Sequence, residues 1–317
     1  MVSQVTDTFE YDVLKGLRQS PKTLPSKYFY DTQGDKLFQQ IMKAPEYYLT
    51  DCEMDIFRNK TDELATLIDH VTEPFDVVEL GAGDCSKTIY LLKKMAANGT
   101  PFTYYPIDIS KNIIDFLETT LPIEIPGHIV YGLNGDYFDM LQETARLSKQ
   151  RKVVLCLGAN IGNMTREEAE GFCEKLYENL APGDLLLMGF DLIKNPRLIL
   201  SAYNDAAGIT SEFNLNLLRR INRELGADFP IGSFEHYCSY EPQTGACKSF
   251  LISLEDVDVT MDAEIISFKK DEYIWMEISQ KYSIEQISEL AYKTGFMPLG
   301  EITDSRNWFA DCVWIRI

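Results

Sequence analysis

From Phe75 to Leu192 the chain alternates short, continuously apolar runs with segments in which apolar residues recur every three or four positions. Apolar runs of this length predict strands buried on both faces, and the recurring pattern predicts helices between them. Together they indicate βαβ units around a parallel sheet. The predicted strands are 75–80, 102–108, 128–133, 152–158 and 183–190. The predicted helices are 86–97, 111–120, 136–147 and 166–180, the last preceded by the capping pair Thr165 and Glu168.

The pattern changes on both sides of this core. Residues 8–70 predict helices and loops, and residues 195–204 and 211–225 predict two further helices. Antiparallel strands are then expected at 234–240 and 247–254, followed by 264–269 and 273–279 around the turn at 269–272. A helix at 283–294 and a pair of strands at 296–303 and 309–317 complete the sheet.

The insertion after residue 192 is too long for a crossover and predicts a second lobe. We therefore expect an α/β fold with one domain at 57–192 plus 282–317 and a lobe at 1–56 plus 193–281.

The first strand runs into a tight turn with two glycines, Gly81 and Gly83, directly before a helix. Glycines there let a nucleotide-like cofactor lie against bare backbone. A NAD site favours a third glycine where this chain has Ser86, and Glu79 stands two residues before the first glycine. These features favour S-adenosylmethionine, with an ordinary turn of an α/β protein as the alternative.

Polar residues also stand at the ends of the next strands, where ligands bind in such sheets. Asp108 is placed to accept hydrogen bonds from both ribose hydroxyls of an adenosine. Asp136 is placed to accept from the adenine amino group while Tyr137 flanks the ring, although a helix N-cap explains Asp136 equally well. Asn160 and Asn163 follow the fourth strand and offer amides near a reacting group.

Composition narrows the function further. The 317 residues are 45% hydrophobic, and 30 Lys and Arg against 49 Asp and Glu give a net charge of −19. This charge disfavours nucleic acid and anionic membranes as partners. Seven cysteines without a Cys-x-x-Cys pair, and no leader or membrane-spanning run, predict a cytoplasmic protein with reduced thiols. The histidines, His70, His128 and His236, lack ligand spacing, so we expect no metal.

Several longer strings carry a more specific signal. They are Leu24–Asp31, Pro45–Tyr48, Glu79–Gly83 with Lys87–Thr88, Ile161–Asn163, Ala202–Thr210, Phe213–Asn214, Ile221–Phe229, Phe234–His236 and Glu277–Tyr282. Over nearly the whole chain they resemble the histidine Nα-methyltransferases of ergothioneine biosynthesis and their relatives. The resemblance implies a class I Rossmann-like methyltransferase sheet with a substrate-binding lobe of helices and antiparallel strands. It also implies methylation of L-histidine on its α-nitrogen, up to three times, to give hercynine. Separately, we expect the chain to be a monomer.

The same resemblance implies roles for individual residues. The cofactor set is Glu79, Gly81, Gly83, Lys87, Asp108, Asp136 and Tyr137. The amino-acid set is Tyr47, Asn163, Tyr203, Ser249, Glu277 and Ser279, with Tyr30 and Asn163 assigned as catalytic. Within it, Asn163 and Tyr203 bind the α-carboxylate, and Glu277 and Ser279 bind the imidazole.

Alternatives remain for the substrate and for the class of protein. The family pattern has a methionine where this chain has Ser249, and fungal relatives methylate tryptophan or a prenylated tryptophan, so another aromatic amino acid is the second candidate. Glu277 alternatively forms a surface ion pair with Lys281. An NAD(P)-dependent oxidoreductase and a cofactor-binding protein without catalysis are the alternatives of other classes.

Overall fold

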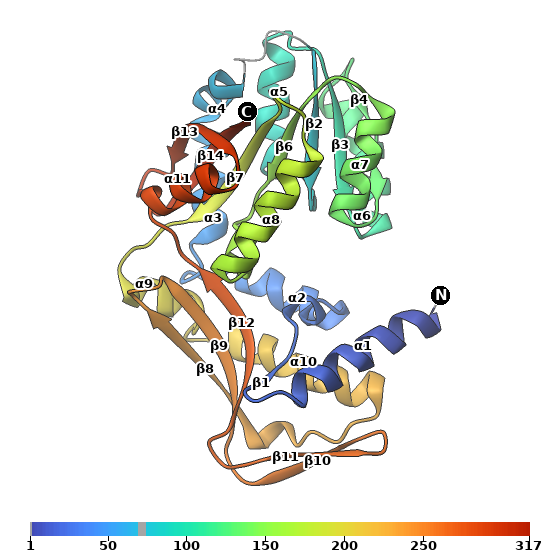
Figure 1. Cartoon of the computed structure of the whole chain (residues 1–317), viewed down its shortest axis with the longest axis vertical. Coiled ribbons are helices and arrows are strands. Elements are labelled where there is room, and N and C mark those ends of the chain that lie inside the picture. The colour runs from blue at the N-terminus through green and yellow to red at the C-terminus, as the bar shows by residue number, and fades with distance from the viewer. Residues whose placement is uncertain (1, 69–73) are drawn as a thin grey trace. The chain divides into compact units, whose positions relative to one another are not determined.

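The computed structural model describes residues 2–68 and 74–317, and this part of the chain divides into two compact units (Figure 1). We call Leu49–Ile193 with Gln280–Ile317 the sheet unit, and Met1–Tyr48 with Lys194–Ser279 the insertion unit. The predicted boundary after residue 56 is wrong because it cuts helix α3 (Leu49–Asn59), which packs against strand β14 (Phe309–Arg316) of the sheet unit. Its buried side chains, such as Cys52 and Ile56, belong to that packing.

The sheet unit is built, within the described residues, on an eight-stranded sheet. Its parallel strands are β2 (Phe75–Leu80), β3 (Phe102–Asp108), β4 (Ile129–Val130), β5 (Leu133–Asn134), β6 (Arg151–Cys156) and β7 (Leu185–Asp191). Strands β13 (Phe296–Thr303) and β14 join antiparallel at one edge. The order is β13-β14-β7-β6-β2-β3-β4, with β5 also paired to β3. The predicted Rossmann-like sheet with a terminal antiparallel pair is confirmed.

This strand order places a switch point beside β2. The chain adds β3 and β4 on one side of β2 and then returns to add β6 and β7 on the other side. Ligands of such sheets bind at the carboxyl ends of the strands beside the switch point, so the loops after β2 and β6 are where a binding site is expected.

The predicted strand at 128–133 is divided into β4 and β5. Between them Gly132 lies against helix α6 (Lys111–Glu124), and a Cβ on it would come within 2.4 Å of the Ile114 side chain. The close approach of backbone and helix interrupts the ladder, which the apolar pattern alone does not reveal.

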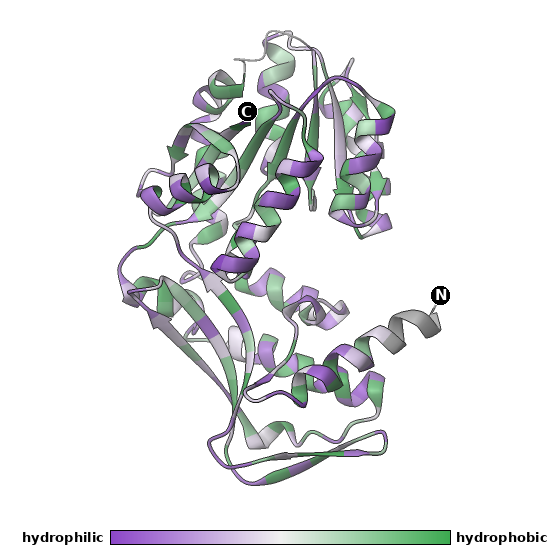
Figure 2. Cartoon of the chain, viewed as in Figure 1, coloured by the Kyte–Doolittle hydropathy of each residue, from purple (hydrophilic) through white to green (hydrophobic). Residues whose placement is uncertain are grey.

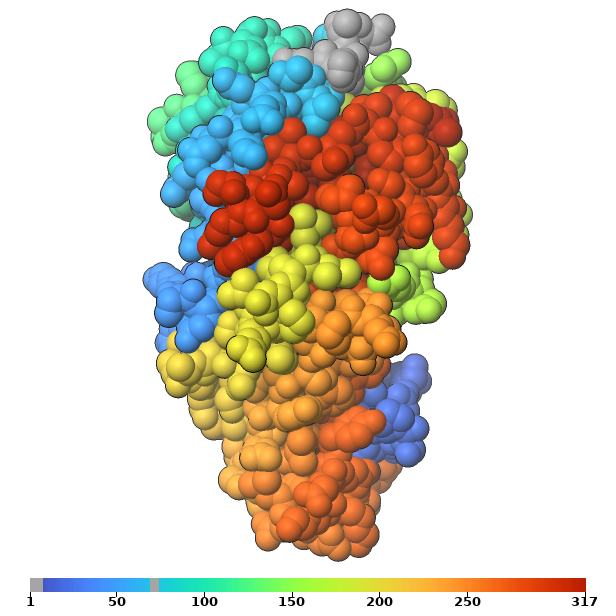
Figure 3. Space-filling model, turned by 90° about the vertical axis from the view of Figure 1, so that its left-hand side faces the viewer, coloured from blue at the N-terminus to red at the C-terminus, as the bar shows by residue number. Residues whose placement is uncertain are grey.

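Helices pack on the sheet as the periodicity predicts. They are α4 (Thr61–Ile68), α5 (Thr88–Ala97), α6, α7 (Tyr137–Leu147), α8 (Arg166–Asn179) and α11 (Ile284–Lys293). Figure 2 shows apolar strands in the sheet and polar residues along α8. Capping boxes begin α8 at Thr165 and α11 at Ser283. Strand β13 contacts α4, and Figure 3 shows their segments side by side on one face of the sheet unit.

The insertion unit combines helices with a small sheet. Its helices are α1 (Val2–Leu17), α2 (Thr32–Ile41), α9 (Pro196–Ala202) and α10 (Ile209–Leu225), with short 3-10 turns η1 (Ser26–Phe29) and η3 (Ile231–Ser233). In the described residues, strands β1 (Lys22–Thr23), β12 (Tyr273–Gln280), β9 (Ala246–Ser253) and β8 (Phe234–Glu241) form a four-stranded sheet in that order. The predicted hairpin of β8 and β9 is confirmed.

Two features of this unit differ from the prediction. Strand β11 (Glu264–Phe268) pairs with the unpredicted β10 (Val257–Met261), whereas the sequence pattern predicted a partner for β11 across the 269–272 turn. Strand β12 instead lies between β9 and β1. The two-residue β1 is too short to give an apolar pattern.

No described helix is long and apolar enough to cross a membrane.

Candidate functional site

The turn after β2 has the backbone conformation that its glycines permit. Gly81 and Gly83 have φ angles of +75° and +51°, in the left-handed region that favours glycine. The Gly81 amide donates to the Ile107 carbonyl at 2.9 Å, which ties the turn to β3. A Cβ on Gly81 would lie 2.6 Å from the Tyr137 hydroxyl, whereas no described atom lies within 4 Å of a Cβ on Gly83. Gly83 thus leaves the backbone open to a ligand, and Gly81 makes room for Tyr137.

Asp108 ends β3 beside this turn. One carboxylate oxygen accepts from the Ser110 amide at 2.8 Å and the other from the Gly83 amide at 3.2 Å. Each carboxylate oxygen has two lone pairs, so this half-buried group retains acceptor capacity for hydroxyls of a ligand. The structure brings Gly81, Gly83 and Asp108 together as the sequence predicts.

Asp136 and Tyr137 begin α7 at the same edge of the sheet. The Asp136 carboxylate accepts from the Phe138 amide at 2.9 Å, so the N-cap alternative for this residue is confirmed. The residue as a whole is exposed. Burial raises the pKa of Tyr137 to about 12, and the phenol therefore remains a neutral hydroxyl beside Gly81.

Glu79 occupies a different environment from the other predicted cofactor residues. It is buried in β2, where it accepts from the Thr88 hydroxyl at 2.6 Å and from the Tyr104 hydroxyl. Burial raises the pKa of Glu79 to about 7, against the opposing effect of those hydrogen bonds. Glu79 therefore joins β2 to β3 and to the start of α5, and its direct contact with a cofactor stays a prediction.

Lys87 stands directly before α5, and its ammonium forms an ion pair with Glu53 of α3. The other Glu53 oxygen accepts from the Gly158 amide at 2.7 Å, just after β6. The sequence analysis missed Glu53, although a signal exists: it lies in the apolar stripe formed by Leu49, Cys52, Ile56 and Phe57. A carboxylate at such a position is unusual and invites a search for its partner.

Three of the predicted amino-acid residues and the predicted catalytic Tyr30 are connected within the insertion unit. The Tyr203 hydroxyl and the Ser279 hydroxyl are 2.6 Å apart, although 76 positions separate them. The Tyr47 ring lies against the Tyr203 ring, with 6.4 Å between their centroids. Phe38 contacts both Tyr47 and Tyr30, with centroid separations of 6.4 and 5.5 Å. This aromatic chain leads from the exposed Tyr30 to the buried Ser279.

The remaining predicted residues lie elsewhere. Ser249 is buried in β9 opposite Cys238 of β8, and the half-buried Glu277 lies on β12, the neighbouring strand. The carbonyl oxygen of Glu277 accepts from the Trp275 indole at 3.0 Å. Asn163 is exposed and ends η2 (Asn160–Asn163) in the sheet unit.

Lys281, the partner considered for Glu277 at the surface, is fully buried and pairs with Asp191 at 2.6 Å. The alternative prediction, a surface ion pair between Glu277 and Lys281, is therefore wrong.

The histidines do not gather into a site within the described residues. His128 stacks on Phe102, and burial lowers the pKa of His236 to about 4. His70 lies outside the described residues. Across residues 2–68 and 74–317, no group of three or more His, Cys, Asp or Glu side chains is arranged to hold a metal ion.

Comparison with known proteins adds a direct finding. A family model described as histidine-specific, SAM-dependent methyltransferase matches residues 9–316. The histidine N-alpha-methyltransferase of Mycobacterium tuberculosis is 34% identical over 288 residues, which cover 88% of this chain and 86% of that protein. Ergothioneine biosynthesis protein 1 of Neurospora crassa is 31% identical over 291 residues, 90% of this chain but 32% of that longer protein.

A third relative, the 4-dimethylallyltryptophan N-methyltransferase of Claviceps fusiformis, is 29% identical over 314 residues, 92% of this chain and 87% of that protein. The family model covers nearly the whole chain. The cofactor named in its description, S-adenosylmethionine, agrees with the glycine turn and the Asp108 carboxylate at the switch point. The chain belongs to the family of histidine-specific, S-adenosylmethionine-dependent methyltransferases.

Proposed function

We propose that this protein transfers methyl groups from S-adenosylmethionine to the α-amino nitrogen of L-histidine, up to three times, and so forms hercynine. The observation that carries the proposal is the match of residues 9–316 to a histidine-specific family. The names of the mycobacterial and Neurospora relatives support the same reaction and a place in ergothioneine biosynthesis. An NAD(P)-dependent oxidoreductase has no support from these matches.

The sheet unit has residues that fit the cofactor. The cofactor would lie against the backbone of the turn at Gly81 and Gly83, and the Asp108 carboxylate would accept hydrogen bonds from its ribose hydroxyls. Asp136 and Tyr137 would contact the adenine, and the Lys87 ammonium would bind the carboxylate of its amino-acid end. When bound, the cofactor supplies a sulfonium methyl, which is already a strong electrophile.

The insertion unit would bind the amino acid. Tyr203 and Ser279, which lie within hydrogen-bond distance of each other, offer neutral hydroxyls for the substrate's polar groups. Tyr47 and Tyr30 would enclose the substrate on the aromatic chain. Glu277 would accept from the imidazole N–H, and Asn163 of the sheet unit would donate to the α-carboxylate. Because the carboxylate is held by neutral donors, the amine remains able to rotate and present each proton site in turn.

A second substrate is favoured by one residue. Ser249 replaces a methionine of the family pattern, and the relative from Claviceps fusiformis is named for a prenylated tryptophan. A smaller residue at this position leaves more room for a bulkier ring, so tryptophan is the second candidate.

Turnover with defined substrates tests the proposal. Purified protein is incubated with S-adenosylmethionine and histidine, S-adenosylhomocysteine release is followed over time, and the amino acid is analysed by mass spectrometry. We expect release that depends on histidine and products with one, two and three added methyl groups. Cofactor binding without release would favour the non-catalytic alternative.

A further inference from the structure

One buried carboxylate is bonded to both loops that flank the switch point. Glu53 pairs with Lys87, which follows β2, and accepts from the amide of Gly158, which follows β6. The Glu53 side chain is 1% exposed and that of Lys87 is 23% exposed. Burial by itself lowers the pKa of Lys87, but the Glu53 carboxylate outweighs that effect and raises it, so the lysine remains charged.

The sheet has space for this carboxylate because β7 carries a glycine beneath it. A Cβ on Gly189 would lie 2.6 Å from a Glu53 carboxylate oxygen, so a side chain there would displace Glu53. Gly189 lies within β7 and has no positive φ, so its backbone conformation does not require glycine. The glycine is therefore explained by the space that the Glu53 carboxylate and the Phe309 ring occupy.

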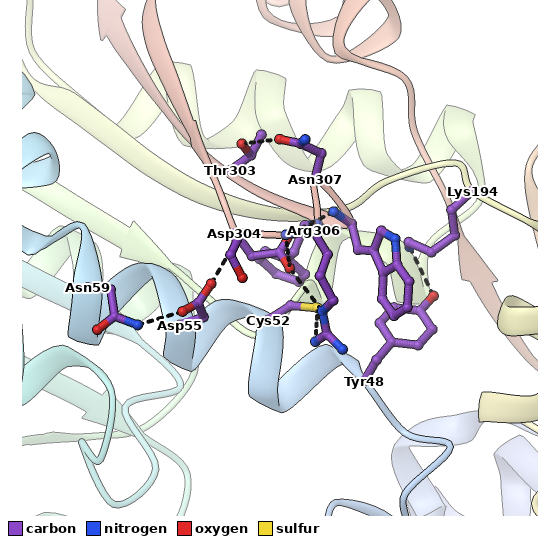
Figure 4. A network of polar contacts seen from close by, with 12 residues as sticks. Tyr48, Cys52, Asp55, Asn59, Lys194, Thr303, Asp304, Arg306 and Asn307 are labelled. Carbon is purple, nitrogen blue, oxygen red and sulfur yellow. Dashed lines mark hydrogen bonds and ion pairs between the residues drawn. The ribbon is translucent and has the colours of Figure 1, made fainter.

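Helix α3 is fixed on both sides of Glu53 by the turn between β13 and β14. Asp55 accepts from the Ser305 amide at 2.7 Å, and the Cys52 sulfur accepts from the Arg306 guanidinium at 3.1 Å. Figure 4 shows Cys52 and Asp55 pointing from α3 toward Asp304 and Arg306. These bonds hold α3 against the sheet, so the helix backbone that carries Glu53 is fixed in position.

We propose that Glu53 is a positioning residue of the cofactor site, which holds the Lys87 ammonium ready for the carboxylate at the amino-acid end of S-adenosylmethionine and fixes the loop at Gly158 through its amide. This inference rests on the proposed role of Lys87 toward the cofactor. A lysine side chain has many rotamers, and fixing it before the ligand arrives reduces the entropy lost on binding. A carboxylate can accept on both of its oxygens, whereas an amide of the same shape has a single acceptor oxygen.

Asp311 offers a matched control in the same cluster. It lies on β14 opposite Gly189, is fully buried, and neither of its oxygens has a hydrogen-bond partner among the described residues. Burial, together with the nearby Glu53, raises the pKa of Asp311 well above its ordinary value, against the opposing charge of Lys87. The protonated acid bonds to neither loop, so Asp311→Asn makes the same carboxyl-to-amide substitution in this cluster without removing a charge or a hydrogen bond.

The test compares two ligands that differ in the amino-acid end. S-adenosylhomocysteine has the carboxylate and 5′-methylthioadenosine lacks it, and the dissociation constant of each is measured by calorimetry on the whole chain. We expect Glu53→Gln to weaken S-adenosylhomocysteine binding by about tenfold or more, as loss of a charged hydrogen bond does, and to change 5′-methylthioadenosine binding by less than about twofold. Asp311→Asn should change both by less than about twofold.

Lys87→Met completes a double-mutant cycle. Because Glu53 acts through Lys87, adding Glu53→Gln to Lys87→Met should cost little further affinity. Three results would overturn the proposal. They are an equal loss of affinity for both ligands in Glu53→Gln, losses of S-adenosylhomocysteine affinity that add up in the double variant, and tighter binding of S-adenosylhomocysteine by Glu53→Gln. If Glu53→Gln does not fold, Glu53→Asp, which keeps the charge but shortens its reach, should give the same selective loss. Failure of the unmodified protein to bind either ligand would instead refute the cofactor assignment.

Discussion

Replacing Glu79 with Gln should change how stability depends on pH. The carboxylate is buried in β2, and its oxygens accept from the hydroxyls of Thr88 and Tyr104. Hydroxyls can both donate and accept, so the amide of Gln at this position can be satisfied by rotation of one of them. The substitution therefore removes a buried charge without leaving a polar group unpaired.

The magnitude follows from the pKa of Glu79. Burial raises it from 4.5 to about 7. Each pKa unit corresponds to about 1.4 kcal/mol, so the ionised carboxylate costs the folded state about 3 kcal/mol once the pH exceeds the folded pKa. Because the folded pKa is the higher one, this contribution to stability is fully present below pH 4.5 and is lost as the pH rises through about 7.

The free energy of unfolding of both proteins is measured by urea titration. Circular dichroism and tryptophan fluorescence both monitor the transition, so that coincident curves can be checked. Relative to the unmodified protein, Glu79→Gln should gain about 2–3 kcal/mol between about pH 5 and about pH 8. Glu178→Gln, on the exposed face of α8, serves as the control and should show no such gain. A difference between Glu79→Gln and the unmodified protein that stays constant with pH would refute the burial argument.

Five further substitutions test the site. Asp108→Asn should weaken S-adenosylhomocysteine binding by about tenfold in calorimetry, because a charged acceptor of the ribose is lost; an unchanged dissociation constant contradicts the assignment. Gly81→Ala and Gly83→Ala should both weaken it, the former because its Cβ would press on Tyr137 and the latter because its Cβ would fill the space left open to the cofactor; an unchanged dissociation constant in either variant would contradict the role of that glycine. Tyr203→Phe should raise the KM for histidine about tenfold with little change in kcat, and histamine should be a poor substrate of the unmodified enzyme; efficient methylation of histamine argues against a carboxylate clamp. Glu277→Ala should reduce histidine methylation by up to about 10⁴-fold and shift preference toward tryptophan, and a fixed ratio of the two products would exclude Glu277 as the imidazole partner.

The sequence predicted the sheet well because its central strands are buried on both faces. Strands β2 and β3 begin and end where the apolar runs do, and β13 does likewise at the edge. The glycine turn and Asp108 were also predictable, since ligand-binding residues follow the carboxyl ends of strands. In the structure the Gly83 amide donates to the Asp108 carboxylate, a bond that the sequence pattern did not predict.

Other features depend on tertiary contacts that local patterns do not encode. The approach of Tyr203 to Ser279 joins residues 76 positions apart, and β12 takes its place between two strands that are not its sequence neighbours. Glu53 and Asp311 are carboxylates inside apolar segments, which periodicity treats as isolated exceptions. Their contacts can be identified only once the fold places α3, β7 and β14 against one another.

Competition between histidine and tryptophan tests the central claim most directly. The unmodified protein receives equal concentrations of both amino acids with S-adenosylmethionine, and the products are fragmented in the mass spectrometer to locate the added methyl groups. The proposed function predicts that histidine is consumed first and that the methyl groups accumulate on its α-nitrogen up to the trimethylated product. Preferential methylation of tryptophan, or methylation of the imidazole ring, would contradict it.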